Sequence, residues 1–453
     1  MVAVATLELV ADGLTPVGAY AALRAADPGP SFLLESVVGG ERWGRFSILG
    51  YRPRRDVVIE ADGRDPFASL ADLCPAAGDT ADAVAARFAG AHVGYLAYDL
   101  VHFATKVPRW PSHEPLARLV GDATVVVFDA LRQTVTIAAR DAADVARARD
   151  DLRGAVALRA LDVPDPAALP EGVETLVDDA SFEQRVRRAQ EYIRAGDAFQ
   201  IVLARPFVVD ARGTDPFDAY RALRVLSPSP YMYFLDLPAR GNAPALQIAG
   251  ASPETLVRVE GDAISLRPIA GTRRRGRDAA DDARLAAELL ADPKELAEHV
   301  MLIDLARNDV GRVAQTGSVE VPVRMSVEHF SHVMHIVSEV RGRLRPELST
   351  WDVVRAAFPA GTLTGAPKVR AMQIIRELEE RPRGVYGGAV GWFGAGRQLD
   401  CAIAIRTIVH RDGRFEVTAG AGVVEGSVPA LEAMETRNKA RAALAAIRAA
   451  RGV

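Results

Sequence analysis

The sequence has few of the features that mark secreted, membrane or nucleic-acid-binding proteins. Among 453 residues it has only two cysteines, Cys74 and Cys401, in no paired motif, which argues against a disulfide framework and a cysteine zinc site. No uncharged apolar run is long enough to span a bilayer. A net charge of -4 gives no basic excess for nucleic acid or anionic lipid. We therefore expect a cytoplasmic protein with no nucleic-acid or membrane partner.

The chain does contain enough apolar sequence, 49% of its residues, for a large core. The strand-like runs SFLLESVV, AHVGYLAY and ATVVVFDA are followed by a predicted helix over 141–160 and a predicted loop, VPDPAALPEG. Blocks of strands between helical pairs favour the α+β class. We expect an N-terminal region over 1–165, interleaved with the main fold, and a catalytic domain over 175–453.

Local signals predict several element boundaries. Ser181 is expected to be the N-cap of a helix, with Gln184 completing a capping box and Gly196 following the helix end. The strand FQIVLARPFVV should come next. The segments ETLVRV and AISLRPI, joined by Glu260, Gly261 and Asp262, are typical of a hairpin.

Two helices carry glutamates three residues apart. Asp292 and Pro293 predict the start of one helix, in which Glu295 and Glu298 share a face. Glu295 also suits a capping box. The second pair, Glu432 and Glu435, precedes Lys439 at the spacing of an ordinary solvated ion pair. If the helices converge, the four carboxylates would suit a hard divalent cation, but spacing alone leaves both alternatives open.

Other segments combine small or charged residues with apolar surroundings. His335 alternates with apolar residues on a predicted strand, where a buried structural histidine is the competing interpretation. The loop FPAGTLTGAPK before a helix offers backbone N–H groups to an anion, but it lacks Walker A spacing. Glycines in YGGAVGWF and TAGAGVV indicate bulges or close backbone approach. Arg406, within the predicted strand AIAIRTIV, requires an anionic partner if it is buried.

These residues resemble the chorismate-utilising enzymes, and most closely the large-subunit family of anthranilate synthase. The similarity covers nearly the whole chain. It rests on these ordered blocks: SFLLES, SPSPYM, ASPETL, RPIAGTRRRG, DPKELAEHVMLIDLARNDVGRV, HVMHIVS, FPAGTLTGAPKVRAM, YGGAVG, AIAIRT and AGAGVVEGSVPALEAMETRNKA. The resemblance implies a four-layer α/β/β/α fold with two facing antiparallel sheets and a Mg²⁺ site.

The resemblance also implies a role for each matching residue. Glu298 and Glu435 would bind Mg²⁺ directly, and Glu295 and Glu432 would do so through water. Glu254 would be the general acid for the departing 4-hydroxyl of chorismate, with His335 in the chemistry and Thr362 near the ring. The implied substrate-binding residues are Gly271, Thr272 and Lys439 around the ring carboxylate, and Tyr386, Arg406, Gly420, Ala421 and Gly422 around the enolpyruvyl carboxylate. Ammonia would add at C2, the 4-hydroxyl would leave, and pyruvate would then be eliminated to give anthranilate.

Two positions separate the chain from its relatives. Enzymes of the group that add water are similar to this chain but have a lysine at the position of Gln200. Aminodeoxychorismate synthases have a nucleophilic lysine at the position of Ala270. Anthranilate synthesis is thus the expected activity, within tryptophan biosynthesis. The alternatives are aminodeoxychorismate synthase component I and a tryptophan-binding regulatory protein without turnover.

Partners follow from what the sequence lacks and from a further resemblance. Neither cysteine lies in a glutaminase elbow, so ammonia is expected from a separate glutamine amidotransferase subunit in a hetero-oligomer. Residues 33–36 and 227–232 resemble two halves of a pocket for L-tryptophan as feedback inhibitor, although strand core and a turn would explain them equally. The implied inhibitor-binding residues are Glu35, Ser36, Pro230, Tyr231 and Met232.

Overall fold

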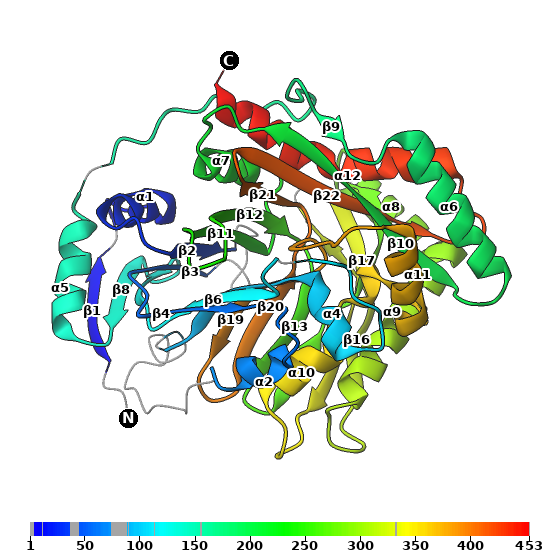
Figure 1. Cartoon of the computed structure of the whole chain (residues 1–453), viewed down its shortest axis with the longest axis horizontal. Coiled ribbons are helices and arrows are strands. Elements are labelled where there is room, and N and C mark those ends of the chain that lie inside the picture. The colour runs from blue at the N-terminus through cyan, green and yellow to red at the C-terminus, as the bar shows by residue number, and fades with distance from the viewer. Residues whose placement is uncertain are drawn as a thin grey trace.

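The structure is a computed structural model that describes residues 4–10, 12–36, 45–73, 88, 90–112, 114–154, 156–330 and 333–452. Cys74 and the last two residues of SFLLESVV lie outside these ranges. Two antiparallel sheets face each other, and helices cover their outer faces (Figure 1). This is the four-layer α/β/β/α arrangement that the sequence resemblance implied.

The first sheet has 12 strands. In spatial order they are β1 (Ala5–Val10), β8 (Thr134–Ala139), β7 (Thr124–Asp129), β3 (Phe46–Tyr51), β2 (Ser31–Glu35), β11 (Tyr231–Leu237), β12 (Leu246–Ser252), β21 (Thr407–Arg411), β22 (Arg414–Val423), β10 (Gln200–Asp210) and β18 (Gly365–Ala366), with β9 (Glu174–Thr175) also on β10. The helices α1 (Pro16–Ala26), α5 (Ala142–Asp151), α6 (Asp179–Arg194), α7 (Pro216–Leu226) and α12 (Pro429–Arg451) pack on this sheet.

The second sheet has 10 strands. They run β15 (Ile269–Arg274), β17 (Val333–Arg343), β14 (Ala263–Leu266), β13 (Thr255–Glu260), β20 (Gln398–Ile403), β19 (Ala389–Gly394), β5 (His92–Leu96), β6 (Ala117–Gly121) and β4 (Arg55–Ile59), with β16 (Glu320–His329) on β17. The helices α2 (Pro66–Ala71), α8 (Ala279–Ala291), α9 (Pro293–Gly311) and α10 (Thr350–Ala357) belong to its outer layer. The described part of the chain also contains η1 (Tyr98–Leu100), α4 (Val101–Ala104), η2 (Gly361–Leu363) and α11 (Lys368–Leu378), of which α11 packs on β10 of the first sheet.

The period-2 geometry of strands explains how one sheet is buried on both faces. In β11, Met232 and Phe234 join the core beneath the helices, while Tyr233 and Leu235 join the core between the two sheets. Successive side chains of a strand point to opposite faces, so an uninterrupted apolar run is required when both faces are covered. This explains why YMYFL reads as continuously apolar rather than alternating.

The N-terminal part of the chain supplies strands to both sheets. In the first sheet β2 pairs with β11, so that Glu35 lies opposite Met232. In the second sheet β5 pairs with β19, so that Gly94 lies opposite Gly391. The segment 156–173 between the two parts contains no helix or strand, as the proline-rich sequence predicted. No helix in the described part of the chain has the length and apolar composition needed to cross a membrane.

Most local predictions are confirmed, and two boundaries are wrong. The hairpin β13–β14 forms, with Glu260 opposite Ala263. The predicted cap at Ser181 is wrong, because Asp178 caps α6 and accepts a hydrogen bond from the Ser181 backbone N–H at 2.7 Å. The predicted helix over 141–160 ends at Asp151 as α5, and a turn follows in which the N–H groups of Arg153 and Gly154 donate to the carbonyls of Asp150 and Asp151.

Arg406 is not inside a strand, contrary to the sequence prediction. The apolar run is split into β20 and β21, which belong to different sheets, and Arg406 lies between them with a left-handed φ of 51°. Non-glycine residues rarely adopt this conformation, so the surrounding structure must hold it. The chain therefore crosses from one sheet to the other at this residue.

A buried ion pair ties this crossing region to the first sheet. The guanidinium of Arg383 contacts the Glu379 carboxylate at 2.5 Å and donates to the carbonyl groups of Val202 and Leu363, both at 2.8 Å. Glu379 in turn accepts from the Ala204 N–H at 2.8 Å. The pair thus joins β10, the loop after η2 and the segment leading into β19.

We expect Arg383→Met to lower the free energy of unfolding by about 3–5 kcal/mol, because it leaves a buried carboxylate without its cation. Arg187 pairs with Glu183 at the same sequence spacing, at 2.9 Å, but is exposed. The matched change Arg187→Met should cost less than about 1 kcal/mol. Urea unfolding followed by circular dichroism measures both, and equal losses would show that the buried network is unimportant.

Candidate active site

A cavity of about 730 Å³ lies between helices α9 and α12, and Arg406 at the crossing between the sheets is part of its wall. Nearly all the catalytic, substrate-binding and acidic residues predicted from the sequence line it. They are Glu254, Gly271, Thr272, Glu295, Glu298, His335, Thr362, Tyr386, Arg406, Gly420, Gly422, Glu432, Glu435 and Lys439. Ala421 is the exception, since it is fully buried and does not line the cavity.

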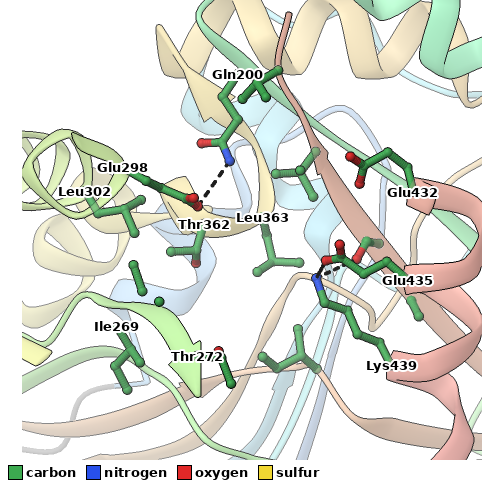
Figure 2. Close-up of a pocket in the computed structure, with 18 of the residues that line it drawn as sticks. Gln200, Ile269, Thr272, Glu298, Leu302, Thr362, Leu363, Glu432, Glu435 and Lys439 are labelled. Carbon is green, nitrogen blue, oxygen red and sulfur yellow. Dashed lines mark hydrogen bonds and ion pairs between the residues drawn. The ribbon is translucent and has the colours of Figure 1, made fainter. Parts of the chain in front are cut away.

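The two glutamate pairs reach this cavity from opposite sides. Figure 2 shows Glu298 on one side, and Glu432 and Glu435 on the helix across from it. On α9 the Asp292 carboxylate accepts from the N–H groups of residues 294 and 295, which fixes the start of the helix and aims its first turns at the cavity. The sequence could place each pair on one helix face, but only the sheet packing makes them face each other.

The acidic residues have defined partners. The amide of Gln200 donates to Glu298 at 3.4 Å, and the ammonium of Lys439 contacts Glu435 at 2.6 Å. Lys439 also donates to the Gly420 carbonyl at 3.0 Å, so it joins α12 to the glycine strand β22. The Glu435–Lys439 pair therefore lines the cavity, and because its side chains are 45% and 38% exposed it also contacts solvent.

The donor chemistry fits a hard divalent cation, although no compact cluster is preassembled. Nowhere in the described ranges do three histidine, cysteine or carboxylate side chains gather closely enough to hold a metal ion. Burial, reinforced by the charge of Glu435, raises the pKa of Glu432, and a bound cation would favour its charged form. Oxygen donors arriving as two pairs match the preference of Mg²⁺ for a few carboxylates plus retained water.

Glu254 lies in the turn between β12 and β13, and it differs from the two glutamate pairs in being suited to give up a proton. Burial raises the pKa of its carboxyl to about 7, although the hydroxyl of Thr362 donates to it at 2.9 Å and Lys439 attracts it. A carboxyl with this pKa is partly protonated near neutrality. It is suited to proton donation.

His335 is oriented by the backbone of β15. Its Nδ1 lies 2.9 Å from the Gly271 carbonyl, which only accepts, so Nδ1 carries the hydrogen. Burial lowers the pKa of the ring, which keeps it neutral and leaves Nε2 able to accept a proton. Gly271 has a φ of 66°, and a Cβ there would lie 3.2 Å from Glu295. His335 is therefore placed to accept a proton in the cavity, in addition to any structural role.

A cationic corner forms where the glycine strand meets the crossing residue. Tyr386 is buried with its hydroxyl against Gly420, where a Cβ would come within 2.6 Å of that oxygen. Close backbone approach, and not a bulge, thus explains this glycine. Burial lowers the pKa of Arg406, which no hydrogen bond or ion pair in the described residues neutralises. Its guanidinium, together with the Tyr386 hydroxyl, suits a carboxylate ligand.

One charged residue that lines the cavity was not identified from the sequence. Lys294 lines the cavity, and its charge lowers the pKa of Glu432 against the effect of burial. Its position between the N-cap Asp292 and Glu295 was the available signal, but a lysine in a first helical turn is ordinarily solvated.

A second cavity of about 190 Å³ lies between the sheets, at the start of β11. All five residues predicted to bind an inhibitor line it: Glu35, Ser36, Pro230, Tyr231 and Met232. Adjacent pairing of β2 and β11 brings the two distant segments together. The Ser36 hydroxyl is buried without a partner in the described residues, whereas Glu35 is engaged by Tyr220 at 2.7 Å and Arg224 at 2.8 Å.

Known proteins of one family match the whole chain. The sequence model for chorismate binding enzymes matches residues 39–445. The chain is 44% identical to anthranilate synthase component 1 of Pseudomonas putida, over 97% of this chain and 94% of that protein. It is 45% identical to anthranilate synthase component 1 of Streptomyces coelicolor, over 98% of this chain and 88% of that protein.

Solved structures share the architecture. The crystal structure of anthranilate synthase component I from Streptococcus pneumoniae has a TM-score of 0.78 and 35% identity, covering 96% of this chain and 99% of that one. The menaquinone-specific isochorismate synthase of Escherichia coli has a TM-score of 0.72 at 19% identity, covering 99% of this chain and 94% of that one, which shows a common fold.

The raised pKa of Glu254 predicts a pH-dependent stability. Because its folded pKa of about 7 exceeds its ordinary value of 4.5, the stabilisation is complete below about pH 4.5 and is lost as pH rises to about 7. Relative to Glu254→Gln, the wild type should lose stability on the order of 3 kcal/mol over this window and no more above it. Paired urea unfolding from pH 4.5 to 8 measures the difference. A constant difference would mean that the carboxyl titrates normally.

Proposed function

The chain belongs to the chorismate binding enzyme family, and from this membership we propose that it is a lyase catalysing the anthranilate synthase reaction. In this reaction chorismate and ammonia give anthranilate, pyruvate and water. One observation carries the choice within the family, namely that Gln200 and Ala270 both line the cavity. The water-adding relatives have a lysine at the position of Gln200, and the aminodeoxychorismate-forming relatives have a lysine at the position of Ala270. Neither the Gln200 nor the Ala270 side chain serves as a base or an amine nucleophile.

Two ends of the cavity suit the two carboxylates of chorismate. The uncompensated guanidinium of Arg406, the Tyr386 hydroxyl and the close backbone at Gly420 would hold the enolpyruvyl carboxylate. The ring carboxylate would lie near Thr272 and Lys439, toward the acidic helices. A dianion held at both ends is fixed in position relative to Glu254 and His335.

We propose that Mg²⁺ is the cofactor at the acidic end. Glu298 and Glu435 would hold it directly, and Glu295 and Glu432 would do so through water. When bound, the ion neutralises the carboxylates of the two helices and anchors and polarises the ring carboxylate. The support is the convergence of oxygen donors from α9 and α12 on one cavity.

Two residues would move protons. The Glu254 carboxyl, partly protonated near neutrality, would protonate the 4-hydroxyl as it departs. The neutral ring of His335, held through Nδ1, would accept the proton from C2 at Nε2 before pyruvate leaves. The Thr362 hydroxyl, which donates to Glu254 at 2.9 Å, would fix the orientation of the acid.

Ammonia would come from a partner. The relatives are named as component 1, which implies a second component. We propose that this is a glutamine amidotransferase subunit, because the sequence has no cysteine in a glutaminase elbow. The complex would be a cytoplasmic hetero-oligomer.

The purified chain should form fluorescent anthranilate from chorismate, Mg²⁺ and an ammonium salt at mildly alkaline pH, and little from glutamine alone. Glu298→Gln should abolish this activity, because it loses a charged oxygen ligand at almost unchanged volume. Glu288→Gln, at an exposed position paired with Arg284, is the matched control and should be fully active. Aminodeoxychorismate or isochorismate as main product would overturn the proposal, and an active Glu298→Gln would overturn its metal site.

We also propose that L-tryptophan binds in the second cavity and inhibits turnover. The cavity combines an apolar wall of Pro230, Val390 and Trp392 with polar groups at Tyr231 and Asp400. The unpartnered Ser36 hydroxyl is a further ligand for an amino acid. Glu35 would not bind the ammonium directly, because Arg224 and Tyr220 already occupy its carboxylate. Such a ligand inhibits only to the extent that it favours a less active conformation.

Tryptophan titrations at fixed chorismate should separate two substitutions of Ser36. Ser36→Ala keeps the space and removes one hydrogen bond, so the inhibition constant should rise by about tenfold. Ser36→Phe fills the cavity and should abolish inhibition, while both variants keep ammonia-dependent turnover. Unchanged sensitivity of Ser36→Phe would refute this location of the pocket, and an uninhibited wild type would refute the regulation.

A further inference from the structure

A small cavity of about 40 Å³ lies behind Glu254, on the side away from the main cavity. The two cavities share Glu254, Thr362 and Leu302 in their walls. On its other side the small cavity is lined by Asp309 of α9 and by the half-buried residues Arg267 and Leu305. Glu254 is therefore reached from two directions.

Asp309 is a buried charged residue that the proposed chemistry leaves without a role. It is 5% exposed, and its Oδ2 contacts the ammonium of Lys368 at 2.6 Å. Lys368 also donates to the Ala357 carbonyl at 3.3 Å. The other carboxylate oxygen, Oδ1, is buried with no hydrogen-bond partner in the described residues. A buried carboxylate oxygen is costly unless a further donor reaches it.

The small cavity supplies the space for that donor. A water molecule needs roughly 10–15 Å³ of such volume and two to four polar partners. Asp309 and Glu254 are the two acidic residues that line this cavity. The charged groups nearby are Lys368 and Arg312 around Asp309, Lys439 near Glu254, and Arg267, which is paired with Glu328 at 2.5 Å.

We infer that water in this cavity links Asp309 to Glu254, and that this path returns a proton to Glu254 after each turnover. Asp309 is thus a proton-relay residue that does not touch the substrate. The inference rests on the proposed function, in which Glu254 is the general acid. The main cavity is occupied by substrate and product during the cycle, so a separate route allows the acid to be recharged before they leave.

The proton balance closes over one cycle. The O–H bond of Glu254 breaks and its proton goes to the 4-oxygen of chorismate, whose C–O bond breaks to release water as the N–C2 bond forms. Solvent first protonates the Asp309 carboxylate, Asp309 passes that proton to the cavity water, and the water passes one of its own protons to the Glu254 carboxylate. Asp309 thereby ends the cycle ionised again beside Lys368. The added nitrogen loses one proton to solvent through the main cavity. No oxidant or reductant is required.

Pre-steady-state kinetics at about pH 6 test this relay, because Glu254, with a pKa of about 7, then begins the first turnover mostly protonated. With chorismate, Mg²⁺ and ammonium, Asp309→Asn should give a burst of one anthranilate per chain at the wild-type rate, followed by steady-state turnover at least about tenfold slower. The KM for chorismate should stay unchanged. Small weak acids in the buffer should partly restore the slow phase, because they deliver protons in place of Asp309.

Three further variants keep the test decisive. Asp309→Asn with Lys368→Met removes both charges and avoids an unpaired buried lysine if the single variant folds poorly. Ala306→Val, which adds apolar volume to the cavity wall, should produce the same burst without touching either carboxylate. Asp304→Asn, an exposed residue of the same helix paired with Arg307, should behave as wild type.

The outcomes separate the relay from the proposed function. A wild type that forms no anthranilate contradicts the proposed function. If the wild type is active, an equal loss in the first and later turnovers, no loss at all, or no response to weak acids contradicts the relay. A burst that appears in both the Asp309 and Ala306 variants supports it.

Discussion

The site depends on one electrostatic constraint, the placement of two acidic helix ends on opposite sides of one cavity. α9 belongs to the helical layer of one sheet and α12 to that of the other, so only the packing of the whole four-layer structure brings Glu298 and Glu435 face to face. Like charges in a half-buried space repel, and Lys439 offsets only part of that charge, at 2.6 Å from Glu435. The energy of the surrounding cores holds this arrangement open for a cation and an anionic substrate.

The same cavity requires the chain to leave one sheet and enter the other. Arg406 occupies that crossing with a left-handed φ of 51°, and the buried pair of Glu379 and Arg383 fixes the neighbouring strands. The crossing places a guanidinium at one end of the cavity and the acidic helices at the other. A dianion with two separated carboxylates is the class of ligand that this polarity suits. Glu254, with a pKa of about 7, lines the same cavity as a carboxyl that can donate a proton.

Much of this could be predicted from the sequence, for reasons that are physical. Asp292 followed by Pro293 is a strong local start signal, and the β13–β14 hairpin follows from a short glycine turn, so both are confirmed. Ser181 and Gln184 have the spacing of a capping box, but the helix begins three residues earlier, where Asp178 accepts the hydrogen bond from the Ser181 N–H. Convergence of the two glutamate pairs, the break at Arg406 and the engagement of Glu35 by Arg224 depend on contacts between distant segments, which local patterns do not contain. The resemblance to a family supplied the residue roles, and the structure supplied their common cavity.

The central claim is that α9 and α12 share one divalent cation next to a bound dianion. Isothermal titration calorimetry of Mg²⁺ into the chain, with and without saturating chorismate, tests it most directly. The account predicts one ion per chain and tighter Mg²⁺ binding when chorismate is present, with the same factor for chorismate when Mg²⁺ is present, because the coupling is reciprocal. Mg²⁺ binding that is absent, or that is independent of chorismate, would contradict it.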